Sequence, residues 1–256
     1  MGFDERLIGA LHVQSMAEGD LAADQPAGVF QASTIAALLH GSYDGDVTFA
    51  ELEGRGDLGL GTLNGVDGEM IAVDGLFLKA DVDGDLSVVP SDAKTPFAVL
   101  ANFDPAHRFE LGGSPSLNAL GEAIDAEVGH PEQVHALRID GTFTRVHARS
   151  VPKQSKPYRP LDQVIADQHV FDFEDVEGTV VGFRFPAEED GLNVPGYHLH
   201  FATADRTRGG HVLDCSLAEG TVQVDDSVDV HLELPPGVEL GGDGDGAALR
   251  RVERED

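Results

Sequence analysis

Residues 191–217 read GLNVPGYHLHFATADRTRGGHVLDCSL and place His198, His200 and His211 within one short segment. Side chains alternate between the two faces of a β-strand, so His198 and His200 point the same way. The chain then turns polar and reaches Gly209-Gly210, so a hairpin can return His211 opposite the pair. The segment therefore predicts two antiparallel strands whose three imidazoles converge on one point.

Three convergent imidazoles are the ligand set of an open zinc site, with a fourth position for water or substrate. The alternative is structural, because a single histidine on a strand is more often a satisfied core residue, and a His-x-His pair is common by chance. The glycines before His211 favour the metal site, since they let the backbone turn tightly. From spacing alone both interpretations stay open. Cys215 is the only cysteine, which excludes a thiolate site and an internal disulfide framework.

Three separated segments carry a resemblance to one known family. The stretch from Val194 to Phe201, followed by Asp205 and the Gly-Gly-His triplet, resembles the metal-binding signature of α-acetolactate decarboxylases. The segment 55–62 with 67–70 resembles the family's N-terminal signature, and 148–154 with 156–158 resembles its central one. The similarity runs from about Phe30 to Glu253. Three motifs in the right order are far more specific than one.

The resemblance implies an activity and a cofactor. The activity is decarboxylation of 2-acetolactate, a small molecule, to acetoin and CO2, a step of acetoin and butanediol metabolism, through a zinc-stabilised enediolate. His198, His200 and His211 would hold Zn2+, although iron, nickel or cobalt would also bind three imidazoles. Neutral ligands leave the ion its full charge, which suits a Lewis acid. The resemblance also implies a homodimer.

The resemblance also assigns catalytic residues. Arg149 would be the second electrostatic element, because a guanidinium can orient a carboxylate at any working pH; outside the motif it would be read as a surface ion-pair partner. Glu69 would deliver the final proton. Thr62 either offers a hydroxyl to the pocket or is an ordinary strand residue. The family places a C-terminal glutamate beside the metal, and Glu253 matches best, with Glu255 as a rival.

The balance of charge limits the partners. The chain has 46 acidic and 17 basic residues, a formal net charge of −29. Such a surface repels nucleic acid phosphates and anionic lipids, which argues against a role on DNA or membranes. A hydrophobic content of 41% argues for a folded chain rather than a disordered one. We expect a halophilic protein whose stability falls at low ionic strength.

The N-terminus has no basic region followed by an apolar run of signal-peptide length, and no stretch reaches the ~20 apolar residues of a membrane span. We therefore expect a cytoplasmic protein.

The pattern predicts an α+β fold: two strand-rich lobes with mixed β-sheets, a few short helices and the active site between the lobes. Residues 1–27 are expected to be a variable extension with room for a short helix. The N-terminal lobe is expected at 28–160 and the metal-binding lobe, with a C-terminal tail, at 161–256. In that tail, 241–246 has the composition of a linker and 247–253 is helix-prone.

Turn signals divide the expected elements. Ser33 is the expected N-cap of the first helix, and Ser114 and Pro115 the expected start of the second. The predicted strands are 47–52, 58–64, 69–73, 76–80, 86–89, 97–102, 135–140, 143–150, 178–185, 197–203, 211–217, 221–224 and 228–234. The predicted helices are 34–39, the segment from 114 to 128, and 161–168.

Other interpretations rank lower. Asp81-Val-Asp83-Gly-Asp85 imitates a calcium loop, but Leu86 stands where glycine is needed, so a hairpin turn is expected. A non-catalytic ligand-binding domain, related to small DNA-binding-associated domains, would share the His-x-His and Gly-Gly-His pattern but not the two upstream motifs. A cupin-like oxygenase would need a glutamate about where Ala204 stands.

Overall fold

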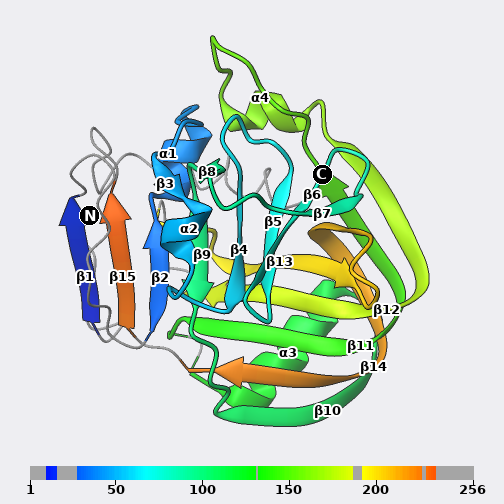
Figure 1. Ribbon diagram of the computed structural model, residues 1–256. Helices are drawn as coiled ribbons and strands as arrows, with labels where there is room; N and C mark the ends of the chain where they lie inside the picture. The colour runs from blue at the N-terminus through cyan, green and yellow to red at the C-terminus, as the bar shows by residue number, and fades with distance from the viewer. Residues whose placement is uncertain (1–9, 16–27, 131, 187–191, 227–228, 235–256) are drawn as a thin grey trace.

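The structure is a computed structural model that describes residues 10–15, 28–130, 132–186, 192–226 and 229–234. Two large β-sheets dominate it, and the strands of one run steeply across those of the other (Figure 1). Four short helices and a two-stranded ribbon complete the described part of the chain. The α+β class, with mixed sheets and few short helices, is confirmed.

Within the described residues, the first sheet has eight strands of mixed direction. Its order is β1 (Ala10–Ser15), β15 (Asp229–Leu234), β2 (Val29–Ala32), β9 (Ala98–Ala101), β4 (Leu58–Thr62), β5 (Glu69–Val73), β6 (Leu76–Ala80) and β7 (Leu86–Val88). The pairings of β15 with β1 and with β2 are parallel, and the others are antiparallel. The ribbon pairs β3 (Val47–Thr48) with β8 (Lys94–Thr95).

The second sheet is antiparallel and built from long strands. Its order is β10 (His107–Ser114), β14 (Gly209–Asp225), β11 (His135–Ser150), β12 (His169–Phe185) and β13 (Gly196–Thr203). The start of β14 also pairs with β13, which closes β14, β11, β12 and β13 into a ring. This closure makes β13 and β14 direct neighbours at one end of the sheet.

Three of the four helices in the described residues begin at a side-chain cap. The helices are α1 (Ile35–Leu39), α2 (Phe49–Leu52), α3 (Leu117–Val128) and α4 (Leu161–Ile165), of which α4 has no side-chain cap. Thr34 rather than Ser33 caps α1, and Ser116 rather than Ser114 caps α3. In each case the capping hydroxyl accepts a hydrogen bond from the backbone N–H three residues on, which satisfies one of the helix's free donors.

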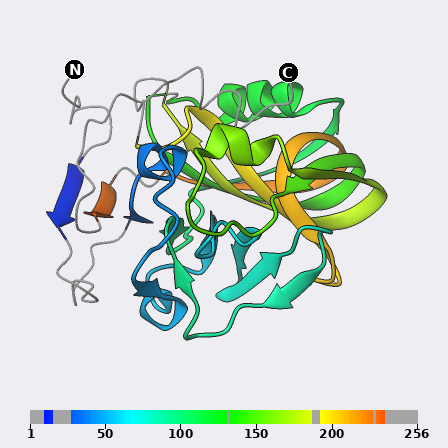
Figure 2. The ribbon, with the colours of Figure 1, turned by 90° about the horizontal axis from the view of Figure 1, so that it is seen from above.

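Buried clusters lie on both sides of the second sheet, and a third cluster covers the other face of the first sheet. Between the sheets, Leu60 and Val99 of the first sheet share a buried cluster with Val181 and Phe183 of the second. On the outer face, α3 packs its buried stripe, which includes Ile124, against the same sheet (Figure 2). Full burial of one such side chain contributes roughly 1.5–3 kcal/mol. The second sheet is therefore covered on both faces, which fixes the positions of its strands.

Several predicted elements were wrong, for local reasons. The strand predicted at 47–52 ends at Thr48, where a capping box with Glu51 starts α2. The breaks predicted near 141 and 220 are absent because Gly141 and Gly220 face each other within continuous strands β11 and β14. A Cβ on Gly141 would lie 2.4 Å from the Glu219 carbonyl oxygen, so glycine here permits a close approach instead of ending a strand.

The arrangement of the sheets differs from the chain order. Strands β10 and β11, which precede residue 160, belong to the sheet that carries the histidines, and β15 belongs to the other sheet. Each sheet therefore contains strands from both sides of residue 160, where the boundary between the lobes was predicted. In the N-terminal extension, Ala10–Ser15 forms a strand rather than a helix. The predicted linker at 241–246 and helix at 247–253 lie outside the described residues.

Candidate metal centre

The hairpin formed by β13 and β14 brings the three histidines together, as predicted. His200 lies directly opposite His211 in the strand register, and His198 lies two residues before His200 on the same face. The ring centroids are 5.2–5.5 Å apart. One ligand atom from each ring lies within 4.8 Å of the other two, and all three side chains are buried.

The glycines before His211 act differently from the prediction. Gly209 and Gly210 do not form the turn but begin β14 itself. A Cβ on Gly209 would lie 2.3 Å from the Phe201 carbonyl oxygen, and one on Gly210 2.8 Å from the Arg149 carbonyl oxygen. Their role is therefore close packing of β14 between β13 and β11, which sets the distance between the imidazoles.

His200 has a defined tautomer. Its Nδ1 lies 2.7 Å from the backbone carbonyl oxygen of Met70, which can only accept, so Nδ1 carries the hydrogen and Nε2 carries the lone pair. Burial, with His211 and Arg149 nearby, holds the pKa of His200 well below its usual value. Burial and Arg149 do the same for the pKa of His211. Both rings are neutral at pH 7, which is the form that binds a metal.

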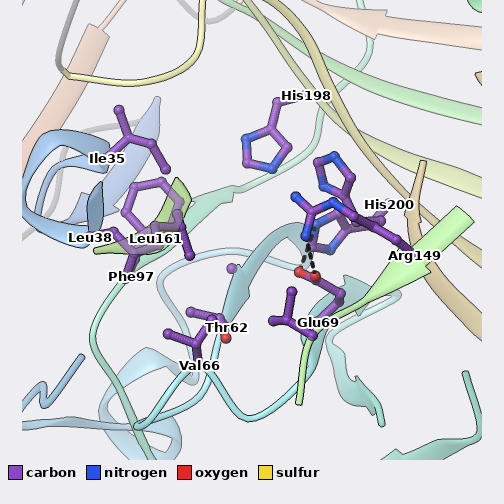
Figure 3. Close-up of a pocket in the computed structure, with 13 residues that line it drawn as sticks. Ile35, Leu38, Thr62, Val66, Glu69, Phe97, Arg149, Leu161, His198 and His200 are labelled. Carbon is purple, nitrogen blue, oxygen red and sulfur yellow. Dashed lines mark hydrogen bonds and ion pairs between the residues drawn. The ribbon is translucent and has the colours of Figure 1, made fainter. Parts of the chain in front are cut away.

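Glu69 and Arg149 meet at the same point from opposite sheets (Figure 3). Arg149 on β11 pairs with His211 on β14, which in turn pairs with His200 on β13. The three residues therefore form one row across the three strands. Nη1 of Arg149 donates to Oε1 of Glu69 over 3.1 Å, and Oε2 of Glu69 lies 3.7 Å from Nε2 of His200. The side chains of Glu69 and Arg149 are buried. The predicted proton donor, the predicted guanidinium and two of the predicted metal ligands thus lie together between the two sheets.

Thr62 lies beside Glu69 in the first sheet, because the two residues are paired between β4 and β5. Its hydroxyl donates to the carbonyl oxygen of Gly68 over 2.7 Å, so toward the pocket it can only accept. Thr62 is buried and lines the pocket. Glu253 and Glu255 lie outside the described residues.

The pocket has a polar half and an apolar half. It encloses about 410 Å3 including its open mouth. The apolar half is made by side chains that the sequence did not single out, among them Leu38 of α1 and Leu161 of α4 (Figure 3). The others are Ile35, Val66, Phe97 and Val151. Their apolar character alone does not distinguish them from core residues.

The donor set fits a divalent metal ion. Nε2 of His200 is buried and makes no hydrogen bond among the described residues. Its lone pair faces the carboxylate oxygen Oε2 of Glu69 across 3.7 Å, an arrangement that a cation close to both would stabilise. Neutral imidazoles with a carboxylate nearby suit zinc and other transition metals better than magnesium or calcium.

A family model described as alpha-acetolactate decarboxylase matches residues 29–240. The chain belongs to the α-acetolactate decarboxylase family. The match includes the two upstream motifs that the binding-domain interpretation lacks. The family membership makes the chain an enzyme, a carboxy-lyase that acts on acetolactate.

Relatives of this decarboxylase family agree in length and fold. The α-acetolactate decarboxylase of Methylococcus capsulatus is 44% identical over 207 residues, 81% of this chain and 80% of the relative. That of Bacillus subtilis strain 168 is 38% identical over 83% of this chain and 84% of its own length. An X-ray structure of α-acetolactate decarboxylase from Bacillus subtilis strain 168 matches with a TM-score of 0.85 and 34% identity, over 89% of this chain and 99% of that one. None of the helices in the described part of the chain is long and apolar enough to span a bilayer.

Proposed function

We propose that the chain converts 2-acetolactate to acetoin and CO2 with a zinc ion held by His198, His200 and His211. The observation that carries this proposal is the placement of three buried imidazoles beside the Glu69–Arg149 pair in one pocket. When bound, the ion supplies a Lewis acid that withdraws electrons from the substrate as the carbon–carbon bond breaks.

Arg149 provides fixed positive charge where the reaction develops negative charge. Loss of CO2 from the 2-hydroxy-3-oxo acid leaves two electrons, which pass onto the adjacent carbonyl oxygen as an enediolate. The guanidinium of Arg149 is buried and held by Glu69, so it need not reorganise during this step. It also offers N–H donors that can orient the substrate's carboxylate before the bond breaks.

Glu69 is the proposed proton donor. The enediolate needs one proton on carbon 2 to become acetoin, so the reaction takes up one proton for each CO2 released. Oε1 of Glu69 accepts from Arg149 and Oε2 lies on the side of His200, so the carboxyl group is held next to the candidate ligands. The held carboxyl group would deliver that proton to one face only.

The other side chains that line the pocket control the surroundings of the substrate. Thr62 offers only an acceptor, which suits a hydroxyl group of the substrate. The apolar half of the pocket, with Leu38, Phe97 and Leu161, fits the two methyl groups of acetolactate and excludes water from the proton donor. We further propose that Glu253 approaches the metal, and that the enzyme is a homodimer in a salt-rich cytoplasm.

The test is acetoin release from racemic acetolactate by the purified protein in molar potassium chloride. Chelator-treated protein would be measured with and without added zinc. We expect activity that is lost with the metal and restored by zinc. A folded, zinc-loaded protein without activity would contradict the proposal, and activity unaffected by complete metal removal would contradict the role of zinc.

A further inference from the structure

His198 does not stand alone in its sheet, because a buried amide lies beside it. Nδ1 of His198 is 3.5 Å from Oδ1 of Asn193, the residue that lies shortly before β13. Asn193 is fully buried, and so is Gln31 of β2, to which its amide nitrogen Nδ2 donates over 3.2 Å. Two amides thus connect the first sheet to a histidine of the second.

The orientation of the Gln31 amide is set by its neighbours. Its Nε2 lies 2.9 Å from the carbonyl oxygen of Ser33 and 2.8 Å from that of Leu192. Both partners can only accept, so this atom must be the NH2 group, with both hydrogens used. The other atom, Oε1, is then an acceptor, and it faces Asn193.

The orientation of the Gln31 amide determines the orientation of the Asn193 amide. Since Oε1 of Gln31 accepts, Asn193 must turn its NH2 group toward it and its Oδ1 the other way. Oδ1 then accepts from the backbone N–H of Val194 over 2.8 Å, which confirms the same assignment independently. The atom of Asn193 that faces His198 is therefore an acceptor in every consistent assignment.

An acceptor beside Nδ1 determines the tautomer of His198. With the hydrogen on Nε2, the lone pair of His198 Nδ1 would face a lone pair of Asn193 Oδ1 in a buried place, which is unfavourable. With the hydrogen on Nδ1, the contact is attractive and the lone pair is on Nε2. The Met70 carbonyl produces the same tautomer in His200.

We propose that Asn193 is a positioning residue that fixes His198 in the Nδ1–H tautomer and thereby presents Nε2 to the metal, with Gln31 fixing Asn193 in turn. This proposal rests on the proposed metal binding by the three histidines. Partners of this kind typically change metal affinity by about 10- to 100-fold when they are removed.

The first experiment measures the tautomer in the metal-free wild-type protein by long-range proton–nitrogen NMR with labelled histidine. We expect His198 and His200 to show a protonated Nδ1 and an unprotonated Nε2. An Nε2–H tautomer of His198 would overturn the proposal. This readout needs neither bound metal nor activity, so its failure is distinct from a failure of the proposed function.

The second experiment compares zinc affinity by competition with a chelator. Asn193→Leu keeps the approximate volume but removes the acceptor, and we expect zinc to bind about 10- to 100-fold more weakly. Asn193→Asp keeps an acceptor toward His198 but loses the donor to Oε1 of Gln31, so we expect a lower melting temperature with an unchanged tautomer and zinc affinity within a few-fold of wild type.

Asn64→Leu is the matched control, because Asn64 bonds only the backbone of Gly45 through its side chain among the described residues. We expect it to lower the melting temperature without changing zinc affinity. Wild-type zinc affinity in Asn193→Leu would overturn the proposal. If Asn193→Leu does not fold, Asn193→Asp decides: an Nε2–H tautomer of His198 in that variant would contradict the proposed role, and a retained Nδ1–H tautomer would support it.

Discussion

The backbone carbonyl of Met70 accepts a 2.7 Å hydrogen bond from Nδ1 of His200, and this contact joins β5 of one sheet to β13 of the other. Met70 directly follows Glu69 in the chain. The strand that carries the proposed proton donor therefore also orients one proposed metal ligand. A displacement of β5 would disturb both at once.

Loss of a candidate metal ligand and loss of Glu69 should have different effects on metal content and on kcat. We expect His200→Ala to lose the metal, because the site is left with two imidazoles. Glu69→Gln should keep the metal and lower kcat by about 100- to 10,000-fold, the usual contribution of a general acid. Metal content and steady-state kinetics test this pair of variants. His107→Ala is the control, since His107 bonds Asp226 outside the pocket. Equal metal loss in the two site variants would remove Glu69 from its role.

Arg149 should act by charge and shape together. Arg149→Met is expected to lower kcat/KM by about 100- to 1,000-fold, as for the loss of one preorganised donor. Arg149→Lys should recover part of that loss, because the charge remains and the planar fork does not. Arg138→Met, which breaks a 2.6 Å ion pair with Asp140 outside the pocket, should leave kcat/KM near wild type. Equal kinetics in the Lys and Met variants would argue against electrostatic stabilisation by Arg149.

The close approach of β14 to β13 can be tested with one methyl group. Gly209→Ala would place a Cβ 2.3 Å from a backbone oxygen, so the strands must separate. We expect a loss of about 1–3 kcal/mol of unfolding free energy and weaker zinc binding. Gly54→Ala is the control, because its Cβ meets nothing within 4 Å and only its positive φ is strained. It should cost stability without changing zinc affinity; a normal zinc affinity in Gly209→Ala would contradict the role of this contact.

Cys215 should be unreactive in the folded protein. Burial, with a smaller contribution from Asp214, raises the pKa of its thiol to about 12 from the ordinary value of 9.0. Only the thiolate is nucleophilic, so alkylation by iodoacetamide at pH 8 should follow unfolding. The unfolded chain releases this proton first, so the thiol's contribution to stability is complete below pH 9.0 and decreases as the pH approaches about 12. Rapid labelling of the native protein would contradict this picture.

Salt should stabilise the protein. At a formal charge of −29, self-repulsion acts over about 10 Å at 0.1 M salt and about 3 Å at 1 M, so the melting temperature should rise between these conditions. Potassium chloride and sodium chloride should act alike if screening is the cause. A melting temperature independent of salt would show that the acidic surface does not limit stability.

The sequence predicted the metal centre better than the sheets around it. The shared face of His198 and His200 follows from strand periodicity, and the return of His211 follows from the polar turn segment before it; the structure pairs the two strands as expected. Edge strand β10 was missed, although its residues alternate between half-buried and exposed. Its turn-forming Gly112-Gly113 pair and partial exposure made the pattern weak.

Other features of the site depend on tertiary contacts that no local pattern carries. The carbonyl group of Met70 that orients His200 is part of the backbone. Every residue has such a group, so the sequence does not show which one makes this contact. Leu38 and Leu161 line the pocket from helices of five residues each, where apolar side chains are also expected in a core. Only the packing of the two sheets distinguishes an apolar side chain that lines the pocket from one that belongs to the core.

The position of β15 has a consequence for how the chain is made. This strand, near the end of the described chain, lies between β1 and β2, which come from its beginning. About 200 residues separate β2 from β15, which a ribosome adds in roughly 10–40 s at 5–20 residues per second. Throughout that time β2 presents an unpaired edge to the cell. A nascent chain of this enzyme therefore depends on β15 to cover β1 and β2.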